Sequence, residues 1–206
     1  MGAPITNMPI IILAAGQSSR MRGADKLMEF VDGMPLVRRQ AQMARAVTSG
    51  DVLVALPPGP HPRHDAVGNL KVFRVEIADA EEGMNASIRQ SFAQLAESTE
   101  VAMLLLCDLP DLQEDDIRCV AQAVEKEPDN LVWRGATEDL RGGHPIVFSK
   151  HLFPAIAQLH GDDGARSVVA KAKGRVALIP LPGNRARADL DTPEDWATWR
   201  AAHLKT

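Results

Sequence analysis

An unbroken apolar run near the N-terminus, Ile10-Ile11-Ile12-Leu13-Ala14-Ala15, ends at Gly16. The run is too short for a stable helix, and an apolar run without polar alternation is typical of a strand that is buried on both faces. Similar short runs recur along the chain, at residues 52–56, 71–77, 101–107, 131–133 and 175–181. We therefore expect the first strand to lie in the middle of a parallel sheet.

Segments with helical spacing separate these runs. Apolar residues recur at intervals of three or four in residues 36–47, 84–95 and 117–124, and Pro35 stands at the expected first helical position of the first segment. A further helix is expected after Gly164. Strands that alternate with helices predict a mostly parallel sheet with helices on both faces.

The last helix is expected to begin with a capping box, Thr192-Pro193-Glu194-Asp195. Thr192 is the N-cap and Asp195 is the acidic residue three positions later. Trp196 and Trp199 lie three positions apart on this helix, and we expect them to anchor it to the sheet.

The chain has the size of one globular domain, expected at residues 9–206 after a loose leader at residues 1–8. A net charge of -4 argues against a protein that coats nucleic acid. Cys107 and Cys119 form no CxxC pair, and no export signal or membrane-length apolar run is present, so we expect a cytoplasmic protein without a membrane partner. The Pro/His-rich residues 57–64 predict a loop that binds no metal.

The loop after the first strand is the first candidate for chemistry, because ligands of open parallel sheets bind beyond the carboxyl ends of the strands. It reads Gly16-Gln17-Ser18-Ser19-Arg20-Met21-Arg22-Gly23-Ala24-Asp25-Lys26. Backbone N–H groups in a small-residue turn, together with spaced cations, are suited to binding a triphosphate. The loop contains neither GxGxxG nor GxxxxGK[ST], which excludes the common dinucleotide and P-loop motifs. A solvated basic turn is the alternative.

Two acids further along the chain are candidates for binding a metal ion. Asp108 ends the apolar run at residues 101–107, and a carboxylate there is costly unless a cation meets it. Magnesium would do so, because it accepts one or two carboxylates and keeps its other positions for water and phosphate oxygens. Asp191 directly precedes the last helix, where stabilisation of the helix start is the alternative role. Four further acids are expected to face solvent or cap helices: Asp111, Asp115, Asp189 and Asp195.

The first loop carries a specific resemblance. Residues Leu13-Ala14-Ala15-Gly16-Gln17-Ser18-Ser19-Arg20-Met21, followed by Lys26, resemble the LAAGxSxRM…K signature of nucleotidyltransferases with the glycosyltransferase-A-like Rossmann fold. Among these, the chain most resembles the MobA-like NTP transferase domains that act on the molybdenum cofactor. One departure is Arg22-Gly23, where the family usually has glycine directly after methionine, so the loop is one residue longer before Lys26.

Further segments match the family in the same order. They are Gly83-Met84-Asn85-Ala86-Ser87-Ile88, Cys107-Asp108-Leu109-Pro110, Gly142-Gly143-His144-Pro145-Ile146-Val147-Phe148, Gly161-Asp162-Asp163-Gly164-Ala165-Arg166 and Asp189-Leu190-Asp191-Thr192-Pro193-Glu194-Asp195. The resemblance implies nucleotide binding by Leu13, Ala14, Ala15, Gly16, Ser18, Ser19, Gly83 and Ser87. It implies acceptor binding by His144 and Arg166, on the side where a pterin ring could stack on Trp133, although a core role is favoured for that indole.

The implied reaction is nucleotidyl transfer, in which a phosphate oxygen of the acceptor attacks the α-phosphorus of a nucleoside triphosphate and pyrophosphate leaves. In the family, the acids matching Asp108 and Asp191 carry Mg²⁺ or Mn²⁺. Arg20 would hold the β and γ phosphates, and Lys26 would stabilise the charge on the α-phosphate. No general base is needed, because the attacking phosphate is already ionised.

The implied acceptor is molybdopterin or its molybdenum-loaded form, and a molybdenum hydroxylase is a candidate recipient of the product. Cytidylyl enzymes of the family resemble Leu-Ala-Ala-Gly and guanylyl enzymes Leu-Ala-Gly-Gly, so Ala15 favours CTP over GTP. Three alternatives stay open. One is a cytidylyltransferase for an isoprenoid-precursor or sugar phosphate, another is a nicotinamide-dependent oxidoreductase, and the third is a non-catalytic chaperone that loads cofactor.

Overall fold

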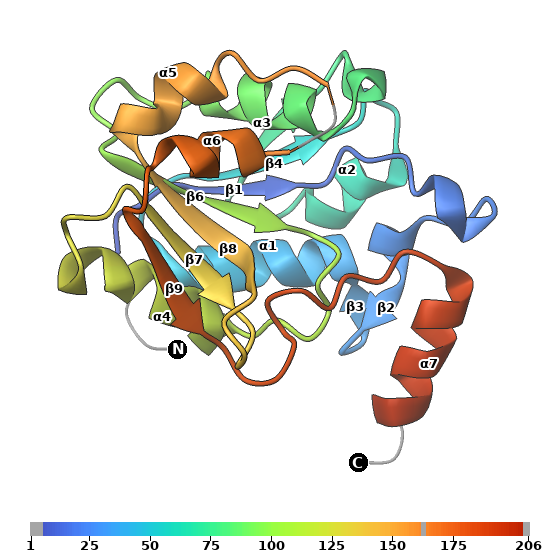
Figure 1. Cartoon of the computed structure of the whole chain (residues 1–206). Coiled ribbons are helices and arrows are strands. Elements are labelled where there is room, and N and C mark those ends of the chain that lie inside the picture. The colour runs from blue at the N-terminus through green and yellow to red at the C-terminus, as the bar shows by residue number, and fades with distance from the viewer. Residues whose placement is uncertain (1–5, 162–163, 204–206) are drawn as a thin grey trace.

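The apolar run at the N-terminus forms β1 (Ile10–Leu13), which lies inside a seven-stranded sheet (Figure 1). The computed structural model describes residues 6–161 and 164–203. The strands follow the order β5-β4-β1-β6-β8-β7-β9. The six other strands of this sheet are β4 (Val52–Leu56), β5 (Phe73–Glu76), β6 (Val101–Leu106), β7 (Val132–Ala136), β8 (Gly142–Ser149) and β9 (Val176–Pro180).

The sheet is mostly parallel, as the alternation of strands and helices predicts. β1 pairs in parallel with both β4 and β6, so its carboxyl end lies beside theirs. β8 is the exception, because it runs antiparallel to β6 and β7. The sequence did not identify β8 as a strand, since Gly142, Gly143 and Pro145 are poor strand formers.

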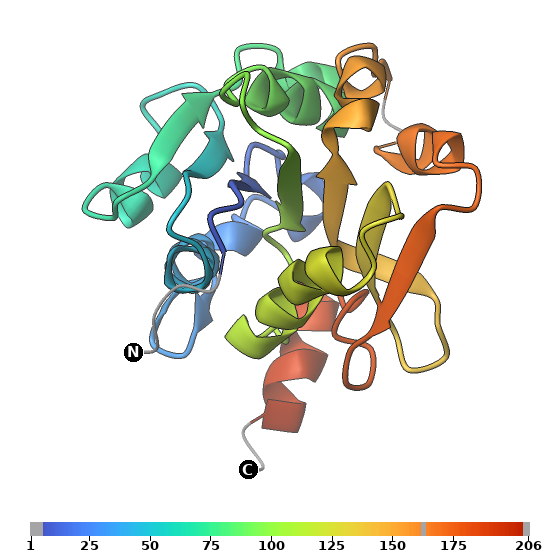
Figure 2. The same cartoon turned by 90° about the vertical axis from the view of Figure 1, so that its left-hand side faces the viewer.

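Helices cover both faces of the sheet and give the expected three-layer α/β/α architecture (Figure 2). Alternate residues of β1 enter the two cores: Ile10 and Ile12 pack with α1 and α4, whereas Ile11 and Leu13 pack with α3, α5 and α6. The helices are α1 (Leu36–Val47), α2 (Pro62–Val67), α3 (Met84–Phe92), α4 (Glu114–Lys126), α5 (Phe153–Ile156), α6 (Arg166–Lys171) and α7 (Pro193–His203). Short elements complete the fold: the hairpin β2 (Phe30–Val31) and β3 (Met34–Pro35), and the 3-10 turns η1 (Ser19–Met21), η2 (Lys26–Met28), η3 (Ala80–Glu82) and η4 (Lys150–Leu152).

Three local expectations need correction. Residues 62–64 belong to α2 and not to a loop, because a proline is tolerated at the start of a helix and His61 Nδ1 accepts the Arg63 N–H. Pro35 precedes α1 and is not its first residue. Residues 6–8 are part of the fold, since Thr6 pairs with Thr48 and Met8 is buried, while residues 1–5 lie outside the described residues.

The C-terminal helix begins with the hydrogen bonds of a capping box. The Thr192 hydroxyl accepts the Asp195 N–H at 3.2 Å, and Asp195 Oδ2 accepts the Thr192 N–H at 2.9 Å. Trp196 is 1% exposed and packs in the core shared with α1 and α4. Trp199 donates its indole N–H to Asp111 Oδ1 at 2.7 Å, so Asp111 supports this helix instead of only facing solvent. These contacts hold the segment that carries Asp191. Within residues 6–161 and 164–203, no helix has the length and apolar character needed to cross a membrane.

Removing the cap should measurably weaken the fold. Thr192→Ala deletes the hydroxyl that accepts the Asp195 N–H, and loss of such a cap costs about 1 kcal/mol of the free energy of unfolding. The control is Thr198→Ala, because the exposed Thr198 hydroxyl only donates to the Glu194 carbonyl within α7 and its loss should cost less than about 0.5 kcal/mol. Urea denaturation measures both values, and equal losses would contradict a capping role.

Candidate active site

Three adjoining cavities lie at the carboxyl ends of β1 and β6. The first has a volume of about 680 Å³, the second about 340 Å³ and the third about 610 Å³. The first two share Ala15, Gly16 and Ser19, while the second and third share Met84 and Leu106. The loop after β1 therefore borders a continuous series of hollows, as expected for ligand binding at this edge of a parallel sheet.

A cluster of charged side chains from distant segments meets at this edge. Lys26 Nζ lies 2.6 Å from Asp108 Oδ2 and 2.6 Å from Asp191 Oδ1, and Arg20 forms an ion pair with Asp191. Lys26 begins η2, Asp108 follows β6 and Asp191 precedes α7. The structure thus brings together the four residues to which the sequence assigned catalysis and metal binding, and the extra residue in the loop does not displace Lys26.

The two acids keep Lys26 charged. Burial lowers the pKa of Lys26, but the Asp108 and Asp191 carboxylates outweigh it, so the pKa is raised overall. Asp189 lies nearby on the same segment as Asp191, and partial burial and the Asp108 charge raise its pKa. The Asp189 side chain still reaches solvent, as expected, but it also lines the third cavity.

The acids have the features of ligands for a divalent cation. Asp108 Oδ1 is buried and has no hydrogen-bond partner among the described residues. The two carboxylates already converge on a cation, the Lys26 ammonium. Across the described ranges, no three histidine, cysteine, aspartate or glutamate side chains form a complete metal site. Two protein carboxylates with phosphate oxygens and water at the other positions suit Mg²⁺ or Mn²⁺.

A buried arginine that the sequence analysis missed holds the loop in place. The Arg63 guanidinium, 2% exposed, donates to the carbonyl oxygens of Ala14 and Gly16 at 2.7 and 2.8 Å. It also donates to Ser18 Oγ at 3.1 Å and to both carboxylate oxygens of Asp25. These five hydrogen bonds use all five N–H donors of the side chain.

These hydrogen bonds of Arg63, here called the clamp, also position the backbone of Lys26. Burial raises the pKa of Asp25, but the hydrogen bonds and charge of Arg63 outweigh this and lower it. Asp25 Oδ1 caps η2 by accepting the Leu27 N–H at 3.0 Å, and Ser18 Oγ accepts the Lys26 N–H at 3.3 Å. Arg63 therefore orients the backbone from which Lys26 extends.

Most residues assigned to nucleotide binding line the first two cavities. They are Leu13, Ala15, Gly16, Ser18, Ser19, Gly83 and Ser87. Gly83 has a φ of 98°, a left-handed conformation that favours glycine, and it directly precedes α3. Ala14 is different: its side chain is buried, it lines none of the three cavities, and its carbonyl is held by Arg63. Its contribution is to the backbone that supports the loop.

The third cavity contains two of the three residues assigned to the acceptor. His144 and Arg166 line it, and burial together with the neighbouring Arg134 lowers the pKa of His144 to about 4. Trp133 is 2% exposed, packs in the core and donates its indole N–H to the Glu127 carbonyl. A pterin ring cannot stack on a covered indole, so the core role is the correct one. The GDxGAR loop is described except for residues 162–163.

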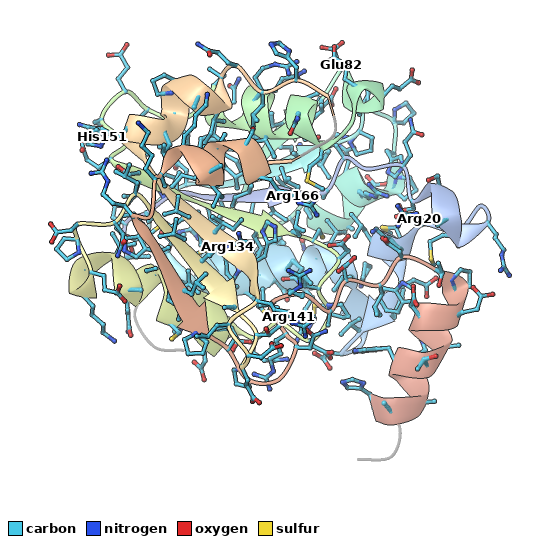
Figure 3. All side chains as sticks on the ribbon, viewed as in Figure 1. Arg20, Glu82, Arg134, Arg141, His151 and Arg166 are labelled. Carbon is cyan, nitrogen blue, oxygen red and sulfur yellow. The ribbon has the colours of Figure 1, made fainter. Side chains whose placement is uncertain are left out.

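Two further arginines in this cavity were not predicted. Arg134 extends from β7, and Arg187 precedes the segment that carries Asp191. Figure 3 shows Arg134 and Arg166 toward β7, β8 and α6, and Arg20 on the loop after β1 at the other side of the site. No sequence motif links Arg134 to Arg187, because β7 and the segment before α7 come together only in the folded chain.

Comparison with known proteins relates the whole domain to nucleotidyltransferases. A model of the MobA-like NTP transferase domain matches residues 10–176. A probable molybdenum cofactor guanylyltransferase of Nostoc sp. is 26% identical, with 94% of this chain and 90% of that protein covered. The purine catabolism protein PucB of Bacillus subtilis is 28% identical, with 93% and 95% covered.

Solved structures show the same fold. Rv0371c of Mycobacterium tuberculosis superimposes with a TM-score of 0.78 at 24% identity, with 96% of this chain and 98% of that chain covered. A second structure of that protein, in complex with manganese, gives a TM-score of 0.76 at 22% identity over 93% and 97% of the two chains.

Shortening the buried arginine should loosen the loop. Arg63→Lys keeps the charge but offers three donors to five acceptors, so the free energy of unfolding should fall by roughly 2 kcal/mol or more. Arg22→Lys is the matched control, because Arg22 forms an exposed ion pair with Glu194 and its change should stay within about 0.5 kcal/mol. Chemical denaturation measures both. A loss at Arg63 no larger than that at Arg22 would show that the clamp contributes no stability.

Proposed function

The chain belongs to the MobA-like NTP transferase domain family. We propose that it transfers CMP, in preference to GMP, to the phosphate of molybdopterin or of its molybdenum-loaded form. The donor is the nucleoside triphosphate and pyrophosphate is released. The observation that carries the proposal is the convergence of Arg20 and Lys26 with Asp108 and Asp191 beside the loop after β1.

Arg20 and Lys26 bind the triphosphate at two depths. The Lys26 side chain is 15% exposed and lies against both acids, so it is placed for the α-phosphate at the reacting end. The Arg20 side chain is 69% exposed and suits the outer β and γ phosphates that leave as pyrophosphate. Binding exchanges carboxylate partners for phosphate oxygens. Charge on these oxygens is then neutralised where it develops in the transition state.

Asp108 and Asp191 would hold Mg²⁺ or Mn²⁺. A bound divalent ion neutralises negative charge on phosphate oxygens. The free Oδ1 atom of Asp108 supports this assignment, since a buried carboxylate oxygen without a hydrogen bond is otherwise costly. A relative of the same fold was crystallised with manganese.

Proton transfer places little demand on the protein. The attacking phosphate is ionised near neutral pH, so no general base has to remove a proton from it. His144 has a lowered pKa of about 4 and is therefore uncharged at neutral pH. In the acceptor cavity, His144 therefore binds and orients the acceptor without supplying a positive charge, and Arg166 binds the acceptor beside it.

Ala15 supports the choice of CTP. Its methyl group lies on the border between the first two cavities, where the guanylyl form of the signature has glycine. A methyl group there reduces the space for a purine more than for a pyrimidine. GMP is the competing nucleotide, because the relative from Nostoc is named as a guanylyltransferase.

A pyrophosphate-release assay tests the reaction. We expect release with CTP, divalent metal and molybdopterin together, and little release when molybdopterin is omitted. Asp108→Asn should lower kcat by about 10³-fold, because a metal ligand contributes several kcal/mol of transition-state stabilisation. The control is Asp115→Asn, an exposed acid in the first turn of α4. Turnover by Asp108→Asn at the rate of this control would refute the metal assignment, and release with a sugar phosphate but not molybdopterin would refute the acceptor.

The base preference has its own test. Ala15→Gly should narrow the ratio of kcat/KM for CTP to that for GTP by about 10-fold, since one methyl group in a binding pocket changes discrimination by 10- to 200-fold. Ala24→Gly provides the control, because Ala24 lines the first cavity from the far part of the loop. An unchanged ratio in Ala15→Gly would remove the argument for CTP.

A further inference from the structure

The third cavity combines an apolar floor with a cationic rim. Its floor is formed by apolar side chains of α3, β6 and α6, among them Met84, Leu106 and Val169, which keep part of their surface accessible. Its charged lining consists of three arginines, Arg134, Arg166 and Arg187, and one acid, Asp189. Such a cavity suits a flat apolar body that carries an anionic group at one end.

Two adjacent glycines make room for two of these arginines. A Cβ atom on Gly142 would lie 2.8 Å from both Cζ and Nε of Arg134. A Cβ on Gly143 would lie 2.8 Å from Cγ of Arg187 and 2.1 Å from the Ala186 carbonyl oxygen. At Gly143 the clash with the Ala186 backbone excludes a side chain, whereas at Gly142 a side chain would require Arg134 to move. In the structure, both arginines pack directly on the glycine backbone.

The carbonyl oxygens of Gly142 and Gly143 accept hydrogen bonds from these two guanidinium groups. Arg134 donates from Nε and Nη2 to the Gly143 oxygen at 3.2 and 3.1 Å, and Arg187 donates from Nη1 to the Gly142 oxygen at 2.9 Å. Each guanidinium retains further N–H donors, because arginine has five. The strand end at residues 142–143 thus presents two oriented guanidinium groups to the cavity.

Among the described residues, no carboxylate pairs with any of the three arginines, whereas the nearby Arg141 pairs with Asp139. Burial lowers the pKa of Arg134, and the positive charges of Arg187 and Arg166 lower it further. Gathering like charges in a partly buried place is unfavourable unless an anion neutralises them.

The proposed reaction requires such an anion. An acceptor phosphate has to approach a triphosphate that is itself strongly negative, and Arg20 and Lys26 lie on the triphosphate side. The third cavity adjoins the second at Met84 and Leu106, and Arg134 and Arg166 lie away from Arg20 (Figure 3). We propose that Arg134, Arg166 and Arg187 bind the phosphate of the acceptor while its aromatic body lies on the apolar floor, an assignment that rests on the proposed function.

This arrangement neutralises the two reacting anions from opposite sides. Guanidinium groups bind phosphate oxygens with two parallel hydrogen bonds, so they fix orientation as well as charge. The enzyme is then selective for acceptors that carry a phosphate next to a flat ring system. An acceptor without the phosphate loses its main contacts as well as its nucleophile.

Binding of two fluorescent pterins tests this assignment directly. The probes are 6-hydroxymethylpterin phosphate and 6-hydroxymethylpterin, which differ only in the phosphate, and fluorescence titration of the full chain gives their Kd values. We expect wild type to bind the phosphate ester at least about 10-fold more tightly, because one charge-assisted hydrogen-bond pair suffices for that ratio. Arg134→Gln with Arg187→Gln should abolish the preference, and Arg141→Gln should retain it.

Two single variants keep the proposal testable if the double variant fails to fold. Arg166→Gln alters an exposed side chain, and it should weaken binding of the phosphate ester about 10-fold by loss of one charged contact. Gly142→Ala keeps every charge but forces Arg134 to move, so it should also reduce the preference. The proposal is overturned if wild type shows no preference for the ester, or if Arg166→Gln and the double variant both bind it as wild type does.

The outcome is separable from that of the proposed function. CTP and Mn²⁺ binding, measured by calorimetry, should be unchanged in the arginine variants. If wild type prefers the phosphate ester but releases no pyrophosphate with molybdopterin, the anion site stands and the proposed reaction falls. If pyrophosphate is released normally by the double variant at limiting molybdopterin, the reaction stands and the anion site falls.

Discussion

The ammonium group of Lys26 lies between two carboxylates that come from the middle and the end of the chain, Asp108 and Asp191. Like charges at such short distance repel strongly when they are partly buried, so the cation is what allows the two acids to share one place. The loop after β1, the end of β6 and the start of α7 are thereby joined at one point. The geometry of the site depends on this junction.

The backbone around the junction is held by a second charge pair. Arg63 is buried and Asp25 is half-buried, and the guanidinium donates its remaining hydrogen bonds to the carbonyl oxygens of Ala14 and Gly16 and to the Ser18 hydroxyl. A loop in this position would otherwise expose unpaired backbone groups and fluctuate. Fixing it in advance lowers the ordering cost of binding a polyphosphate, which is the physical meaning of preorganisation.

Charge is distributed across the cavities in three zones. Arg20, on the loop after β1, forms the first zone, and Lys26 with the two acids forms the central one. The arginines of the third cavity form the last zone. In the proposed reaction, positive charge on both sides would neutralise the two phosphates, and the acids between them would hold the metal ion. This distribution would allow an acidic chain with a net charge of -4 to bring two anions together.

The fold and the central cluster were accessible from the sequence because their signals are local. An apolar run that ends in Gly16 or in Asp108 marks a buried strand and the first residue beyond it, and parallel strands place such residues at one edge. The direction of β8 had no such signal, since Gly142, Gly143 and Pro145 obscure the strand pattern. The burial of Trp133 likewise depends on how β7 and α4 pack and not on neighbouring residues.

The sequence by itself determined the alternation of strands and helices apart from α2 and β8, the loop that borders the site and the two acids beside it, because each follows from a short run of neighbouring residues. Only the tertiary structure decided that Arg63 supports that loop and that Arg134 and Arg187 share a cavity with Arg166. Those roles arise from the docking of α2, β7 and the segment before α7, and a lone arginine in a sequence does not show which carbonyl or charge will lie beside it after folding.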